Sequence, residues 1–158
     1  MSNSDSLISL VPLTDVDSIM NWRHEVLRHV FGEEPTDEVM ANNHSYFRRH
    51  LPDRSFWFVE AAYDGTLAGC GGICLYEELP SPDNPSGLCG YLMNIYVRQP
   101  YRRRGVADAI ISVLIEIARC RNCDKVYLET TEEARQVYHN HGFRQMKDCL
   151  LYTSDAAD

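Results

Sequence analysis

The chain has 158 residues, of which 44% are apolar and 24% charged, and this composition is typical of one globular domain, residues 1–158, that needs neither disulfides nor a metal to stabilise its core. The formal net charge of −8 argues against nucleic acid as the main partner, because that binding depends on clustered Lys and Arg that neutralise phosphates. No apolar run reaches the roughly 18 residues of a membrane span, and the N-terminus lacks the basic region of a signal peptide, so we expect a cytoplasmic protein that binds no membrane.

The N-terminal part of the chain predicts one strand and two helices. Residues 8–11 form a short apolar run, and Thr14, with an acidic residue three positions later, has the pattern of a capping box. Apolar residues then recur at helical spacing until Gly32, which predicts the end of the first helix. A second helix is expected over residues 36–50, because Pro52 disfavours helical geometry in the residue before it.

Three strands are predicted next. Residues 56–62 and 66–76 are rich in apolar and aromatic residues, and the Asp-Gly pair between them is typical of a tight hairpin turn. These two strands should therefore pair antiparallel. A proline-containing loop over residues 77–87 separates them from a third strand over residues 88–97.

A phosphate-binding motif follows the third of these strands. Residues 95–107 read I-Y-V-R-Q-P-Y-R-R-R-G-V-A, and the apolar residues from Val106 to Ala118 then fall on one face of a helix. A helix N-terminus presents unpaired N–H groups and about half a positive charge, so a loop placed there binds anions. Gly105 lets the main chain approach a ligand closely. The basic cluster of Arg98, Arg102, Arg103 and Arg104, with the helix start, predicts a site sized for the phosphates of one cofactor.

The remaining elements place this loop at the edge of a sheet. Residues 125–130 have the composition of a strand, and residues 132–141 predict a short helix that ends at Gly142. A strand, a helix and a second strand joined by a right-handed crossover form a parallel pair. The loop after the first strand and the end of the second then lie on the same edge, where ligands of open α/β sheets usually bind.

Two motifs in this half of the chain resemble the GNAT superfamily of acyl-CoA N-acyltransferases. They are R-x-x-G-x-A at residues 102–107 and A-x-x-x-Y-x-x-x-G-F at residues 134–143, and the resemblance spans about residues 88–152. It implies an α/β (α+β) fold with a mixed, mostly antiparallel sheet, a central splayed parallel strand pair and the order β-α-α-β-β-β-α-β-α-β. Residues 143–152 would supply the closing strand or a short hairpin. Residues 149–158 also resemble the translated sequencing adapter found at the ends of metagenomic gene models, so no functional residue is placed there.

The resemblance implies that acetyl-CoA is the acyl donor. The residues implied to bind it are Ile95, Tyr96, Val97, Arg102, Arg103, Arg104, Gly105, Val106, Ala107 and Thr131. The N–H of Ile95 would point at the acetyl oxygen, and the main chain of Val97 would pair with the pantetheine amides. Arg103 and Arg104 would supply main-chain donors rather than side-chain contacts. Many members of the superfamily carry Asn at the position of Thr131, so that contact differs here.

The resemblance also implies how protons move in the reaction. Tyr138 would be the general acid for the departing thiolate, since its phenol has a pKa near that of a thiol. Members that resemble the histone-modifying branch carry a Glu base four residues before the position of Ile95, but this chain has Tyr91 there. The base therefore stays open. The alternatives are a water relay and the carboxylates of Glu60, Glu77, Glu78 and Glu129.

The predicted function is an N-acetyltransferase that moves the acetyl group of acetyl-CoA to a primary amine of a small molecule or peptide by direct attack on the thioester. The missing strand Glu favours an alternative, a non-catalytic acyl-CoA sensor or interaction module. A generic phosphate-binding α/β protein is a third hypothesis. We expect reduced cysteines and no metal, because the C-x-x-C spacing of Cys120 and Cys123 lacks the further ligands of a zinc site. A homodimer is left open.

Overall fold

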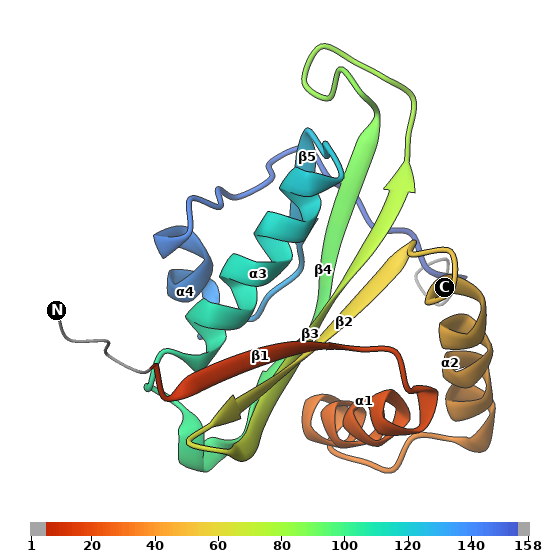
Figure 1. Ribbon diagram of the computed structural model, residues 1–158. Helices are drawn as coiled ribbons and strands as arrows, with labels where there is room; N and C mark the ends of the chain where they lie inside the picture. The colour runs from red at the N-terminus through yellow and green to blue at the C-terminus, as the bar shows by residue number, and fades with distance from the viewer. Residues whose placement is uncertain (1–5, 155–158) are drawn as a thin grey trace, which may run out of the picture.

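A five-stranded sheet with the order β1-β2-β3-β4-β5 forms the centre of the protein in the computed structural model, which describes residues 6–154 (Figure 1). Neighbouring strands are antiparallel except β4 and β5, which are parallel. The elements in chain order are β1 (Ile8–Leu13), α1 (Val16–Phe31), α2 (Asp37–His50), β2 (Phe56–Tyr63), β3 (Thr66–Glu77), β4 (Leu88–Val97), the 3-10 turn η1 (Gln99–Tyr101), α3 (Val106–Cys120), β5 (Lys125–Leu128) and α4 (Arg135–Asn140). The predicted mixed, mostly antiparallel sheet and the predicted order as far as α4 are confirmed.

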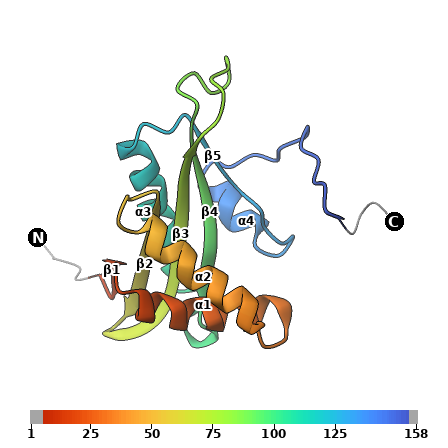
Figure 2. The same ribbon diagram turned by 90° about the vertical axis from the view of Figure 1, so that its right-hand side faces the viewer.

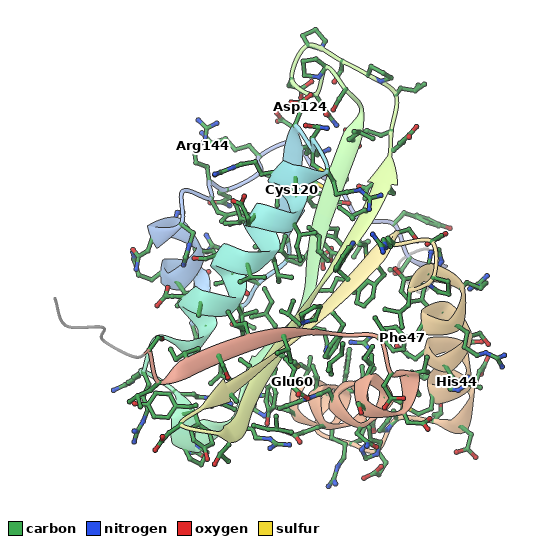
Figure 3. The ribbon with its side chains drawn as sticks, in the orientation of Figure 1. His44, Phe47, Glu60, Cys120, Asp124 and Arg144 are labelled. Atoms are coloured by element: carbon green, nitrogen blue, oxygen red, sulfur yellow. The ribbon has the colours of Figure 1, made fainter. Side chains whose placement is uncertain are left out.

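Helices cover both faces of the sheet, and each face has its own apolar core. On one face, Ile110 and Leu114 of α3 pack in one cluster with Val59 of β2. On the other face, Trp22 of α1 and Phe47 of α2 belong to a second cluster. Figure 2 shows α1 and α2 in front of the strands, and Figure 3 shows Phe47 on the side of α2 that faces the sheet. The sheet therefore separates α3 from the pair α1 and α2.

Helix α1 begins at an aspartate cap. The Asp15 carboxylate accepts hydrogen bonds from the hydroxyl of Ser18 at 2.6 Å and from its N–H at 3.1 Å, and both bonds lower the pKa of Asp15. The predicted capping box at Thr14 is thus one residue early, because Asp15 is the N-cap residue and its carboxylate binds a free N–H group of the first turn. Gly32 ends the helix in the left-handed region at φ +72°, as predicted.

Strand β3 and helix α3 approach each other closely at Gly71. A Cβ atom at this position would lie 2.5 Å from Cγ2 of Ile110 and 3.1 Å from Cδ1 of Leu114. Ile110 and Leu114 are fully buried, so neither side chain has room to move aside. Only glycine fits at this point, and its small size lets the N-terminal half of α3 lie directly on β3.

Strand β4 contains a bulge in its second half. Between the facing pairs Gly72–Met93 and Cys70–Tyr96, one residue of β3 lies opposite two residues of β4, which is the pattern of a β-bulge. Asn94 lies within the bulge and has a left-handed φ of +60°. Because a bulge bends and twists the strand that carries it, the last residues of β4 take a new direction.

The strand and the helix in the C-terminal part of the chain are shorter than predicted. β5 ends at Leu128 rather than at residue 130, and α4 covers Arg135–Asn140 rather than residues 132–141. The prediction of a closing strand over residues 143–152 is wrong, since these residues form no strand.

The segment after α4 also shows why no strand forms there. Leu150, Leu151 and Tyr152 are 97%, 82% and 78% exposed, so beyond Phe143, which packs on the core, the end of the segment is not held on the sheet by these apolar side chains. In Figure 2 the blue segment that follows α4 runs away from the strands. Part of the predicted non-native tail, residues 155–158, lies outside the described residues.

The structure also bears on the cysteines and on membrane-spanning segments. All six cysteines lie within residues 6–154 and are free, including Cys120 and Cys123. In residues 6–154, no group of three or more His, Cys, Asp or Glu side chains is arranged to hold a metal ion. Within the same range, no helix is both long enough and apolar enough to cross a membrane.

Truncating Ile110 should destabilise the whole domain. The side chain is 0% exposed and lies between β3 and α3, so Ile110→Ala is expected to lower the free energy of unfolding by about 2–5 kcal/mol, the range for cavity formation in a core. Val30→Ala, at a position 63% exposed on α1, should change it by less than about 0.5 kcal/mol. Urea unfolding of both variants checks this; similar losses for the two would contradict the assignment of the core.

Candidate functional site

Strands β4 and β5 pair over four residues and then separate. The parallel register ends at Leu92 and Leu128, whereas β4 continues to Val97. The N–H of Arg98 bonds to the Ala68 carbonyl of β3 at 2.8 Å, so by alternation the main-chain groups of Val97 face the opposite side, towards β5. No strand is present there to pair with them, because β5 has ended. The Val97 carbonyl accepts a hydrogen bond from Arg102, so the gap offers the N–H of Val97 to a ligand.

Gly105 and the first turn of α3 form an anion cradle next to the gap. Gly105 is the N-cap residue at φ +82°, and Arg103 has φ +62°. No side chain caps α3, whereas Asp15 caps α1 and Thr36 caps α2. The first N–H groups of α3 are therefore not occupied by side chains of residues 6–154, and they lie at the positive end of the helix dipole. This geometry suits a phosphate or diphosphate.

The arginines around the cradle have different surroundings. Arg102 donates from Nε to the Val97 carbonyl at 2.9 Å, so its side chain reaches the gap. Arg103 is exposed. The guanidinium of Arg104 lies 5.3 Å from the centroid of the Tyr63 ring on β2. Arg103 is thus the arginine of this loop whose side chain is least engaged by residues 6–154 and has the freest access to a phosphate.

Arg98, which the sequence groups with these arginines, instead fastens α1 to the end of β4. Its guanidinium donates to both carboxylate oxygens of Glu25, at 2.9 and 3.0 Å, and lies 4.4 Å from the centroid of the nearest Trp22 ring. The hydrogen bond from Arg98 lowers the pKa of Glu25. Arg98 therefore forms a structural ion pair with Glu25 and is not free to bind a phosphate. This corrects the prediction that Arg98 belongs to a phosphate-binding basic cluster.

The other predicted donor-site residues lie where β4 runs into α3. The side chains of Ile95 and Val97 pack against the core under α3, while Tyr96 packs on the α1 face. Val106 is buried and Ala107 occupies the first turn of α3. The roles predicted for these residues are accordingly main-chain roles, and their side chains have packing roles of their own.

Helix α4 places Tyr138 beside the N-terminal end of α3. Nε2 of His141, the residue after α4, lies 2.9 Å from a carboxylate oxygen of Asp108 in the first turn of α3. The Tyr138 ring packs edge-on against Phe143, with centroids 5.9 Å apart. Burial raises the pKa of Tyr138, so its phenol stays protonated at neutral pH. No hydrogen bond joins its hydroxyl to another residue in the range 6–154.

Thr131 lies in the turn that precedes α4. Its hydroxyl accepts a hydrogen bond from the N–H of Ala134 at 3.4 Å, and its carbonyl accepts one from the Thr130 hydroxyl at 3.2 Å. Thr131 is exposed. Its side chain therefore stabilises the start of α4, and its predicted contact with the donor stays a prediction.

Three of the carboxylates considered as the base are remote or engaged. Glu77 faces Leu88 at the start of β4, seven residues or roughly 23 Å along the strand from Ile95. Glu78 is 3.2 Å from the amine of Lys125. Glu60 accepts a hydrogen bond from the indole of Trp22 at 2.7 Å.

Glu129 is the one of the four that lies beside the gap. It directly follows β5 and is exposed. Burial and, after it, the charge of Glu129 raise the pKa of Tyr91 on β4. The Tyr91 ring faces that of Tyr127 on β5, with centroids 4.7 Å apart. A carboxylate and a phenol thus adjoin each other at the point where the two strands separate.

A cavity of about 160 Å³ opens on the other side of β4, on the face that α1 and α2 cover. Its walls are Arg23 of α1, Asn43, Tyr46 and Phe47 of α2, Phe56 and Phe58 of β2, Cys74 of β3, and Met93 and Asn94 of β4. Met93 and Asn94 directly precede Ile95, whose N–H is predicted to hold the acyl oxygen. A second substrate in this cavity would meet the donor at the bulge.

Sequence reasoning missed Arg23 as part of the site. Its Nε donates to Oδ1 of Asn43 at 2.8 Å, and its Nη1 to Oδ1 of Asn94 at 2.9 Å. The available signal was its position four residues after Ile19 and four before Leu27. This spacing puts a charged residue on the apolar stripe of an amphipathic helix, where charges are rarely found without a partner.

The model of the acetyltransferase (GNAT) family matches residues 16–143, from the start of α1 to just past α4. The chain belongs to this family. The resemblance seen in the two sequence motifs is thereby confirmed, and the protein is an acetyl-CoA-dependent N-acyltransferase. The matched residues include the gap, the cradle and the cavity.

Curated relatives of this GNAT protein are also acetyltransferases. It is 36% identical over 128 residues to the glucosamine 6-phosphate N-acetyltransferase of Trypanosoma brucei brucei, covering 81% of this chain and 84% of that protein. It is 31% identical over 159 residues to N-alpha-acetyltransferase 30 of Saccharomyces cerevisiae, covering 99% and 79%. A 32% identical match to the uncharacterized N-acetyltransferase YjgM of Escherichia coli covers 63% of this chain and 56% of that protein, so the chain spans little more than half of that relative.

Solved structures share the fold. A predicted acetyltransferase with acetyl-CoA from Clostridium acetobutylicum superposes with a TM-score of 0.81 at 22% identity, covering 92% of this chain and 96% of that one. The aminoglycoside N-acetyltransferase AAC(6')-Iy in complex with CoA gives 0.72 at 15% identity, covering 98% and 99%. Identities this low establish the GNAT fold alone, and the coenzyme in both structures agrees with acetyl-CoA as the acyl donor.

Removing the charge of Glu25 should weaken the protein in a pH-dependent way. Because the folded state lowers the pKa of Glu25, the pair with Arg98 stabilises the fold above the ordinary carboxyl pKa and loses this effect as pH falls through the lowered value. Glu25→Gln should therefore be less stable than wild type at pH 7, and the difference should shrink towards about pH 3.

Urea midpoints across this pH range provide the measurement. Glu34→Gln is the matched control, since Glu34 pairs with Arg28 at the surface with 63% of its side chain exposed, where ion pairs contribute little. If the loss of stability in Glu25→Gln stayed constant with pH, it would come from altered packing and not from the loss of the ion pair.

Proposed function

We propose that this GNAT protein is an N-acetyltransferase that transfers the acetyl group of acetyl-CoA directly to a primary amine. The observation that carries the proposal is the continuous main-chain surface from the unpaired end of β4 to the uncapped start of α3. The diphosphate of the donor binds at Gly105 and its neighbours, and the pantetheine arm lies along Val97. The thioester then reaches the bulge at Ile95, opposite the cavity between α1, α2 and the sheet.

The chemistry requires a neutral amine, a polarised carbonyl and a proton for the leaving sulfur. An alkylammonium with a pKa near 10.4 costs about 4–5 kcal/mol to deprotonate at pH 7. The amine nitrogen attacks the thioester carbon, and the N–H of Ile95 stabilises the oxygen as negative charge develops on it. The C–S bond then breaks, and coenzyme A leaves as a thiol once it takes up a proton.

Tyr138 supplies that proton in this proposal. Burial raises its pKa, so the phenol is in its protonated form at neutral pH, which is the form that a general acid needs. Its hydroxyl has no partner among residues 6–154 and is available for the coenzyme sulfur. The edge-on contact with Phe143 and the link between His141 and Asp108 hold α4 against α3.

Glu129 is the carboxylate best placed to receive the proton of the amine, through Tyr91 or ordered water. It follows β5 where the gap begins, and its charge already acts on Tyr91. Glu77 and Glu78 lie at the far end of β4, and Glu60 is held by Trp22. A non-catalytic acyl-CoA sensor is the less favoured alternative, because the site presents both a phenol and a carboxylate near the gap.

Free thiol should appear when the protein is mixed with acetyl-CoA and a suitable amine. The panel includes glucosamine 6-phosphate, a peptide with a free α-amine and an aminoglycoside, since relatives or fold neighbours carry these names. Calorimetry should show coenzyme A binding more tightly than ADP. Tight coenzyme binding without amine-dependent thiol release would favour the sensor alternative, and equal binding of both nucleotides would favour a generic phosphate site.

Tyr138→Phe should slow turnover and leave donor affinity intact. The change removes only the hydroxyl, so kcat should fall by about 10²–10⁴-fold, the usual contribution of a general acid, while the dissociation constant of coenzyme A stays within about two-fold. Steady-state kinetics and calorimetry give the two values. Tyr152→Phe, at a position 78% exposed, is the control; an unchanged kcat in Tyr138→Phe would remove Tyr138 from the mechanism.

A further inference from the structure

Arg23 lines the acceptor-side cavity without an acidic partner in residues 6–154. Its two hydrogen bonds, from Nε and Nη1, go to the neutral side-chain carbonyls of Asn43 and Asn94, and no Asp or Glu lies within ion-pair distance of it. The second terminal nitrogen, Nη2, makes no hydrogen bond to the described residues. Arg23 thus keeps donors free on a wall of the cavity.

The other arginines in residues 6–154 either pair with a carboxylate or are exposed. Within residues 6–154, the Arg–carboxylate pairs are Arg28 with Glu34, Arg98 with Glu25, Arg119 with Glu116 and Arg135 with Glu132. The chain has 23 acidic residues against 15 Lys and Arg, so acidic partners are abundant. An unpaired arginine in a partly buried position of such a chain therefore calls for a ligand.

The burial of the Arg23 guanidinium supports the same conclusion. Burial is the main cause that lowers the pKa of its guanidinium, which reflects the loss of water around the charge. A buried charge that lacks an opposite charge is costly to the fold. The two asparagines orient the guanidinium and accept two of its hydrogen bonds, but they do not neutralise its charge. An anion bound in the cavity would neutralise it.

The rest of the cavity is apolar and aromatic. Tyr46, Phe47 and Phe56 form mutually packed rings with centroids 5.5 to 5.7 Å apart, and Met93 and Cys74 add sulfur atoms. A cavity of about 160 Å³ admits a small molecule or the end of a larger one. Arg23 is therefore one charged contact in surroundings that otherwise favour an apolar body.

We propose that the amine acceptor carries an anionic group, a carboxylate or a phosphate, which Arg23 binds while Asn43 and Asn94 hold the guanidinium in place. This inference rests on the proposed acetyl transfer. Asn94 joins the two functions, because it supports Arg23 and directly precedes Ile95 at the bulge. The anion fixes the acceptor at one end of the cavity, and the amine then points to the thioester.

The test uses pairs of acceptors that differ in charge. Phenylalanine is compared with phenylalanine amide, and glucosamine 6-phosphate with glucosamine, so that the two pairs distinguish a carboxylate from a phosphate. In wild type, kcat/KM should favour the anionic member of at least one pair by about 10- to 100-fold, the range for one hydrogen-bonded charged contact. Arg23→Gln should abolish this preference, because it lowers kcat/KM of the anionic member far more than that of the neutral member.

Arg28→Gln provides the matched control, because Arg28 lies on the same helix and its side chain is 60% exposed. It should keep the wild-type preference. Thermal unfolding of all three proteins shows whether Arg23→Gln remains folded. The proposal is overturned if wild type has no preference in either pair, or if Arg23→Gln keeps the wild-type preference or loses activity equally on charged and neutral acceptors.

A failure of acetyl transfer itself would be recognised separately. If no amine is acetylated although coenzyme A binds, the proposed function fails, and calorimetric titration with N-acetylphenylalanine and glucosamine 6-phosphate decides the role of Arg23. Binding of either anion that weakens by about ten-fold or more in Arg23→Gln would uphold the anion site. Equal binding by wild type and Arg23→Gln, or none by either, would reject it.

Discussion

The β-bulge in β4 is the constraint on which the site depends. It places two residues of β4 opposite the single residue Gly71, and Gly71 in turn is fixed because α3 packs directly upon it. The bulge redirects β4 just beyond the last residue that pairs with β5. Main-chain groups that a regular sheet would satisfy internally are therefore left for a ligand, at the same edge as the uncapped start of α3.

The two halves of the site use different kinds of atoms. Towards α3, the groups that face the gap and the cradle belong to the main chain, and the side chains of Ile95, Val97 and Val106 serve the core. Towards α1 and α2, the cavity is lined by side chains, with Arg23 as its charged member. Arg98 connects the halves, because it directly follows β4 and forms an ion pair with Glu25 of α1, the helix that also carries Arg23.

The elements of the proposed donor half could be predicted from the sequence because they are local. A strand, an Arg-rich turn with Gly105 and an amphipathic helix follow one another without interruption, and each has its own signal. The acceptor half could not, since Arg23, Asn43 and Asn94 are up to 71 positions apart and meet only in the folded chain. The closing strand was implied by the family resemblance, and it fails because strand formation needs burial. Beyond Phe143, the apolar side chains of Met146, Leu150, Leu151 and Tyr152 stay exposed.

The contrast between a main-chain cradle and a side-chain cavity bears on how such a protein diversifies. Substituting exposed side chains in the first turn of α3 does not move its main-chain N–H groups, so binding of an anion by these groups tolerates sequence changes there. The cavity walls from α1 and α2 have no such protection, and a few replacements around Asn43 or Tyr46 would present a new surface to acceptors. Proteins that descend from one ancestor can in this way keep the same acyl donor while they change their acceptor.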